Sequence, residues 1–134
     1  EQIGKALREC GEAAEDYGVE IWLEVHGSTR RPDHIRQILN IADHPSVGAC
    51  WNSNPDEPEN GSIARWFAML RPLIRSCHIT DLTNLYPWRE LFSLLKDAGY
   101  SRYTLAEIPG SSDPDRVMSY YARLWREMTG FLEG

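Results

Sequence analysis

The sequence predicts an α/β fold in which parallel strands alternate with helices, as in a β/α barrel. Four short apolar segments each end in a polar residue, and they cover residues 19–27, 47–54, 73–81 and 103–110. The polar ends recur every 26 to 29 residues, with a helical pattern between successive segments. That repeat length is typical of the strand-and-helix units of a barrel. Because helices separate the strands, the sheet should be parallel.

The first two elements are a helix over residues 1–17 and a strand over 19–25. Apolar residues in the helix follow one another at three- and four-residue spacing, and Gly18 is typical of a helix end. The strand is apolar enough to be buried on both faces, as strands of parallel sheets usually are.

The second unit begins with a helix at Pro32, a residue that suits the first turn. A buried strand over residues 47–51 and a polar loop over 52–60 follow. Ser62 can cap the next helix, and Pro72 ends it. Loops that follow barrel strands often carry function, so the 52–60 loop is a candidate part of a site.

The third strand covers residues 73–79, and a helix between Pro87 and Gly99 follows it. The fourth strand, over 103–108, should be buried. Asp113 and Pro114 then have the residue types of a helix N-cap and first position. This last helix should run to about residue 130 and bury five side chains: Val117, Tyr121, Leu124, Trp125 and Met128.

Length and charge limit the function classes. The chain has 134 residues, enough for one domain over residues 1–134, but a closed barrel needs roughly 250. A net charge of −6 argues against a nucleic-acid or anionic-membrane partner, which a basic surface would bind. No apolar run is long enough to span a membrane, and the first residues lack a basic-then-apolar pattern, so we expect no secretory signal.

The three cysteines have no metal-binding or redox spacing. We expect Cys10, Cys50 and Cys77 to be reduced thiols in or near the core of a cytoplasmic protein. The chain begins inside a helical pattern with Glu1 rather than Met, which suggests a fragment or a processed chain.

The polar strand ends are the candidate site: Glu24, Asn52, His78 and Glu107. Parallel strands bring their carboxyl ends to one face of a barrel, where active sites lie. Carboxylate and amide oxygens with an imidazole nitrogen suit a divalent ion such as Mn²⁺, Mg²⁺, Co²⁺ or Zn²⁺. Taken singly, the two glutamates are equally typical of salt bridges, Asn52 of a turn, and His78 of a core or strand-end histidine. The spacing that they share favours the metal site.

Other residues near these strand ends are candidates for substrate binding: His26, Asn54, Asp81 and Trp88. His26 lies two residues beyond Glu24, so both side chains should point to the same side of the strand. Each of these residues is also typical of an ordinary loop or surface position.

Four strings, LEVHG, VGACWNSNP, CHITDL and AEIPGS, resemble strands five to eight of the xylose isomerase-like TIM barrels. The resemblance implies an α/β fold that forms half of a TIM (β/α)8 barrel. It implies metal ligation by Glu24, His78 and Glu107, with Asn52 where the family usually has an Asp ligand. It also implies that Glu24 and Glu107 are the catalytic acid and base.

The resemblance implies a metal-dependent isomerase or epimerase of a sugar or sugar phosphate, acting by proton transfer through an enediolate. An endonuclease IV-like metal-dependent nuclease is a second interpretation, which the acidic composition disfavours. A non-catalytic barrel fragment, in which Asn52 marks a degraded metal site, is a third. Four units leave open sheet edges, so we expect either a homodimer or an N-terminal half-barrel to complete the structure.

Overall fold

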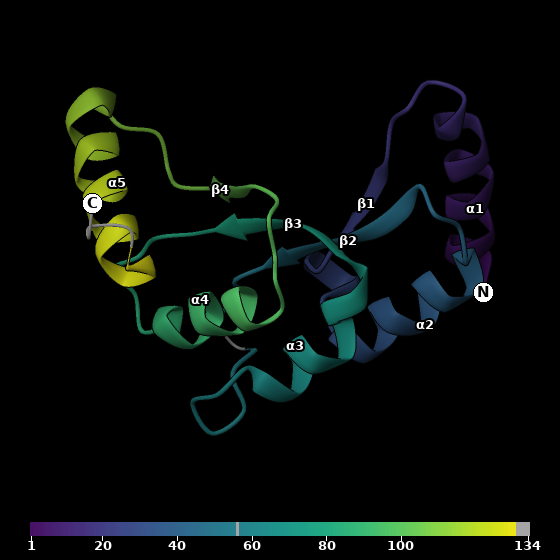
Figure 1. The fold of residues 1–134 in the computed structure, drawn as a ribbon, viewed down its shortest axis with the longest axis horizontal. Coiled ribbons are helices and arrows are strands. Elements are labelled where there is room, and N and C mark those ends of the chain that lie inside the picture. The colour runs from purple at the N-terminus through teal and green to yellow at the C-terminus, as the bar shows by residue number, and fades with distance from the viewer. Residues whose placement is uncertain (56, 131–134) are drawn as a thin grey trace.

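The structure is a computed structural model that describes residues 1–55 and 57–130. Position 56, inside the loop predicted over 52–60, and the last four residues of the predicted domain lie outside the described residues. Helices and strands alternate along the chain (Figure 1), in the order α1 (Gln2–Glu15), β1 (Ile21–Glu24), α2 (Pro32–Ala42), β2 (Val47–Asn52), α3 (Ala64–Leu70), β3 (Ile74–Ile79), α4 (Trp88–Asp97), β4 (Thr104–Ala106) and α5 (Pro114–Thr129). Short 3-10 turns, η1 (Gly27–Thr29) and η2 (Arg71–Leu73), follow β1 and precede β3.

The four strands form one parallel sheet in the order β1-β2-β3-β4, which confirms the predicted α/β fold. In the register, Glu24 lies opposite Cys50, and Asn52 lies opposite His78. Glu107 follows β4, and its N–H donates to the carbonyl of Ile79 on β3. The carboxyl ends of all four strands therefore lie at the same end of the sheet.

The core lies between the sheet and the helices that cover it, and β2 is buried along its whole length. Trp51 is fully buried and packs edge-on against Phe67 of α3, with 5.6 Å between ring centroids. Its indole N–H donates to the Tyr86 hydroxyl, which donates to Glu57. This chain of hydrogen bonds joins β2 to the loops that follow β2 and β3.

Helix α1 makes its closest contacts through glycines, and of its apolar residues Leu7 packs partly buried against the core. Gly4 and Gly11 are its buried residues, whereas Ile3 is 46% exposed. A Cβ atom at Gly4 would lie 2.7 Å from Ile41 of α2, and one at Gly11 would lie 2.6 Å from Val47. The two glycines thus allow α1 to approach α2 and β2 more closely than any side chain would permit.

The last strand and helix are less buried than predicted, although Tyr121, Trp125 and Met128 of the helix pack partly buried against the core. On β4, Leu105 is 42% exposed, and Tyr103 just before it is 79% exposed. Helix α5 is capped by Asp113 as predicted, but none of its residues is fully buried. Both elements lie at the side of the sheet that β4 forms, and no further strand among the described residues pairs with β4 there.

An ion pair connects the amino ends of the two outermost strands. Arg102, just before β4, donates to Glu20, just before β1, with 2.6 Å between Nη2 and Oε2. The guanidinium also lies 5.3 Å from the Trp22 ring centroid. Because β1 and β4 are at opposite edges of the sheet, this contact requires the sheet to curl. Hydrogen bonding from Arg102 lowers the pKa of Glu20, so the pair is ionised at neutral pH.

The three cysteines are free, but they differ in accessibility. Cys50 and Cys77 are buried, as predicted, whereas Cys10 is exposed on α1, so its expected core position was wrong. Burial, and then the nearby Glu24 carboxylate, raises the pKa of Cys50, and burial raises the pKa of Cys77 strongly.

We predict that Cys10 alone reacts quickly with a thiol reagent in the folded protein, because the thiolate is the reactive form and requires access to solvent. Titration with a chromogenic disulfide should give one fast equivalent, and three in denaturant. A Cys10→Ser variant should lose the fast equivalent, and fast labelling of Cys50 in that variant would contradict the prediction.

Candidate metal centre at the strand ends

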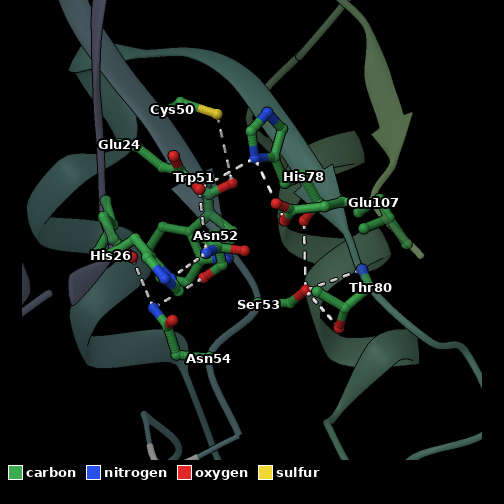
Figure 2. A network of polar contacts seen from close by, with 12 residues as sticks. Glu24, His26, Cys50, Trp51, Asn52, Ser53, Asn54, His78, Thr80 and Glu107 are labelled. Carbon is green, nitrogen blue, oxygen red and sulfur yellow. Dashed lines mark hydrogen bonds and ion pairs between the residues drawn. The ribbon is translucent and has the colours of Figure 1, made fainter. Parts of the chain in front are cut away.

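The carboxyl ends of β1, β3 and β4 bring two carboxylates to one imidazole. His78 Nδ1 lies 3.2 Å from Glu24 Oε1 and 3.4 Å from Glu107 Oε2 (Figure 2). One ligand atom from each residue lies within 4.8 Å of the others. The side chains are 38%, 26% and 51% exposed for Glu24, His78 and Glu107, so solvent reaches the group. The structure thus assembles three of the four predicted metal ligands.

This donor set fits a divalent ion. Ligand distances of about 2.0–2.2 Å place the donor atoms up to about 4.4 Å apart around a metal, close to the separation in this group. Two carboxylates would balance the charge of such an ion. Mixed oxygen and nitrogen ligation suits Mn²⁺, Co²⁺ and Zn²⁺, and the exposed side would leave positions for water or substrate.

Asn52, the fourth predicted ligand, lies at the end of β2 and is 3% exposed. Its Nδ2 donates to Glu24 Oε1 at 3.2 Å and lies 2.9 Å from His26 Nδ1. Its Oδ1 is buried and has no hydrogen-bond partner among residues 1–55 and 57–130. A buried carbonyl oxygen without a donor is costly, by about 1–3 kcal/mol, and a bound cation would satisfy it. This orphaned oxygen supports a metal at the group.

His26 is exposed and joins the network through Asn52 rather than through the carboxylates. Figure 2 shows its ring beside the Asn52 amide, on the side away from His78. The prediction that it lies on the same side of the strand as Glu24 is consistent with this contact, because Asn52 Nδ2 reaches both residues.

Two residues that the sequence interpretation missed hold the strand ends together. Ser53 is 1% exposed, and its hydroxyl lies 3.0 Å from Thr80 Oγ1 and accepts from the Thr80 N–H at 3.1 Å. The same hydroxyl donates to the carbonyl of His78. These contacts fasten β2 to β3 next to the candidate ligands. Serine in a polar loop is so common that no sequence signal marks this one.

The other three predicted substrate contacts do not join this group. Asn54 is buried, and its amide donates to the carbonyl of Val25, which ties the loop after β2 to β1. Asp81 is exposed and accepts from Thr83 in a local turn, which lowers its pKa.

Trp88 is a core residue rather than a surface residue of the site. It is 3% exposed, packs against Tyr86 with 4.6 Å between ring centroids, and donates to Asn84. It was predicted to bind substrate because it lies near a strand end in the sequence, but as the first residue of α4 it turns inward. Burial leaves it little surface for a substrate.

A cavity of about 440 Å³ opens between the loops that follow β1 and β2 and helix α3. Arg30 and Asn54 of the loops and Trp66 of α3 contribute to its lining. Since Glu24 and Asn52 end these two strands, the cavity lies at the same end of the sheet as the candidate metal centre, the end where the strands finish.

The fold is a partial β/α barrel, and the strand-end group at its carboxyl-terminal face could hold a metal ion. A family model described as xylose isomerase-like TIM barrel matches residues 1–128, so the chain belongs to that family. Family membership confirms the resemblance inferred from the strand-end strings.

A solved D-psicose 3-epimerase from Clostridium cellulolyticum H10, described with D-tagatose, has the same fold. It superposes with a TM-score of 0.68 at 18% sequence identity, over 94% of this chain and 51% of that one. The chain therefore spans about half the length of this structure, and the predicted half TIM barrel is confirmed. A comparison with curated proteins finds no significant match.

None of the described helices has both the length and the apolar character that a membrane span requires.

Proposed function

We propose that the chain forms, as one domain, the half of a metal-dependent sugar or sugar phosphate isomerase or epimerase that holds the metal and the acid/base pair. The observation that supports this most is the convergence of Glu24, His78 and Glu107 at the strand ends, beside the orphaned Asn52 oxygen. Family membership and a structural neighbour that is an epimerase agree with the reaction type.

In this proposal Glu24, His78, Glu107 and the Asn52 oxygen hold a divalent ion such as Mn²⁺, Mg²⁺, Co²⁺ or Zn²⁺. The ion supplies Lewis-acid polarisation of the carbonyl and hydroxyl oxygens of the substrate. The residues of the chain orient the sugar and move the proton.

Glu24 and Glu107 come from opposite edges of the sheet, so they can approach a substrate from two sides. One carboxylate removes the proton from the carbon next to the carbonyl, and the electron pair of the C–H bond moves to give an enediolate. The other returns a proton to the neighbouring carbon in an isomerase, or to the opposite face of the same carbon in an epimerase.

Among the described residues, β1 and β4 are the outermost strands of the sheet, and each has one edge without a paired strand. We propose that a second set of β/α units covers them and adds substrate contacts, supplied by a homodimer partner or by an N-terminal half-barrel. The substrate is a small carbohydrate, and the net charge of −6 disfavours nucleic acid and anionic membranes as partners. Cytoplasmic location, which the three free thiols favour, stays a prediction.

The test is solvent exchange. The protein is incubated with Mn²⁺ and a panel of ketoses, aldoses and their phosphates in D₂O, and mass spectrometry measures deuterium in the sugars. We expect one deuterium next to the carbonyl with the preferred substrate. Glu107→Gln should reduce its incorporation by about 100-fold or more, because proton transfer by a positioned acid or base contributes typically 10²–10⁴-fold.

Glu127→Gln on the exposed face of α5 is the matched control, and it should exchange as the unmodified chain does. Full exchange in Glu107→Gln would remove Glu107 from the acid/base role. Absence of exchange with metal bound would instead favour the non-catalytic barrel fragment. Metal-dependent nicking of abasic DNA without sugar exchange would favour the nuclease interpretation.

A further inference from the structure

The Asn52 amide is held in one orientation by two neighbours. Its Nδ2 lies 3.2 Å from Glu24 Oε1 and 2.9 Å from His26 Nδ1, whereas Oδ1 has no partner among the described residues. A carboxylate oxygen only accepts hydrogen bonds, so Nδ2 must donate to Glu24. The second N–H of the same group then points at His26, whose Nδ1 must be the acceptor.

The opposite orientation is unfavourable. Turning the amide by 180° would place Oδ1 about where Nδ2 now lies, against the Glu24 carboxylate, and two acceptors would face each other without a proton. Such a contact combines electrostatic repulsion with the loss of the hydrogen bond to Glu24 in a buried position. Glu24 thus selects the orientation in which Oδ1 is left for another partner, and His26 holds that orientation by accepting the second N–H.

We propose that His26 is a positioning residue that fixes the Asn52 amide so that Oδ1 serves as a neutral ligand of the divalent ion. This inference rests on the proposed function, because it requires the ion to bind at Glu24, His78 and Glu107. His26 itself does not ligate: it belongs to the network through the Asn52 amide, and the group of converging ligand atoms does not include it.

The pairing also explains why an amide suits this position. A carboxylate in place of the Asn52 side chain would face the Glu24 carboxylate, and that contact would be repulsive in the absence of metal. With asparagine, the centre carries two carboxylate charges, and the fourth ligand is neutral. Asn52 and His26 therefore form a matched pair that leaves a neutral oxygen, Oδ1, without a hydrogen-bond partner among the described residues.

A double-mutant cycle tests the inference by calorimetric titration of the whole chain with Mn²⁺. His26→Ala should weaken Mn²⁺ binding by about 10-fold, the lower end of the effect of removing a residue that orients a metal ligand. In the Asn52→Ala background, the same change should alter the Kd by less than about twofold, since no amide remains to be oriented.

His26→Asn should restore most of the affinity, because the Asn Oδ1 is an acceptor at the same place in the side chain as Nδ1. His34→Ala, at an exposed histidine of α2, is the control and should leave the Kd unchanged. Equal weakening by His26→Ala in both backgrounds, or no weakening in either, would overturn the inference alone. Failure of the unmodified chain to bind Mn²⁺ would overturn the proposed metal centre, and the inference with it.

A measurement without metal separates failure of the positioning role of His26 from failure of the proposed metal centre. Long-range ¹H–¹⁵N correlation spectra should show neutral His26 as the Nε2–H tautomer, with the Asn52 side-chain amide shifted in His26→Ala but not in His34→Ala. A purely structural role would not fix the tautomer. Detection of the Nδ1–H form of His26 would overturn the assigned orientation, whatever the metal affinity.

Discussion

His78→Ala should weaken Mn²⁺ binding by about 100-fold or more, because it removes the nitrogen ligand of the proposed metal centre and leaves two carboxylates without a common partner. The imidazole lies within 3.4 Å of both Glu24 and Glu107, so no other described side chain replaces it. Loss of a direct ligand should exceed the effect of removing a positioning residue such as His26.

Thermal unfolding measures this effect through linkage. Mn²⁺ at 100 times its Kd should stabilise the unmodified chain by about 2.7 kcal/mol, provided that the ion does not bind the unfolded state. His78→Ala should show no stabilisation at the same concentration, whereas the His34→Ala control should show all of it. Full stabilisation of His78→Ala would place the ion elsewhere in the molecule.

Trp51→Ala should reduce the free energy of unfolding by about 3–5 kcal/mol, the range for truncating a buried aromatic side chain. The side chain is fully buried and packs against Phe67. Its removal also takes away the donor to the Tyr86 hydroxyl, which contacts Glu57. A loss of this size is a large part of the 5–15 kcal/mol that stabilises a typical domain.

Urea denaturation followed by circular dichroism measures the loss. Trp22→Ala is the matched control, because Trp22 is 39% exposed on an edge strand. It should lose about 1 kcal/mol, from its contacts with Glu20 and Arg102. Equal losses in the two variants would mean that β2 is not the centre of the core.

The order of elements and the parallel sheet could be predicted because local patterns specify them. Buried apolar residues of β2, the proline at the start of α2 and the Asp113 cap of α5 each have a local physical cause that the sequence displays. Their positions in the structure agree with the predicted ones to within a few residues.

Burial at the two ends of the sheet could not be predicted from spacing, because it depends on what lies across from each face. Leu105 has the pattern of a core residue, yet it is exposed because β4 is an edge strand. In α1, the close approach to α2 depends on Gly4 and Gly11, and a glycine in a helix gives no signal that it faces a neighbour.

The candidate ligands could be predicted because a strand end is a defined place in a parallel sheet. Spacing alone located Glu24, His78 and Glu107. Contacts that depend on side-chain direction could not be located in this way. Asn54 and Trp88 turn into the interior, whereas Ser53 turns from an ordinary loop position towards Thr80.

The curl of the sheet gives the strand-end group a mechanical property. Glu24 and Glu107 stand on the two outermost strands, whose amino ends are clasped by the Glu20–Arg102 ion pair. The distance between the two carboxylates therefore depends on the curvature of the whole sheet: a more strongly curved sheet brings them closer together, and a flatter one moves them apart. A partner that pairs with the outer edges of β1 and β4 and changes this curvature would therefore change the separation of the two carboxylates without contacting them.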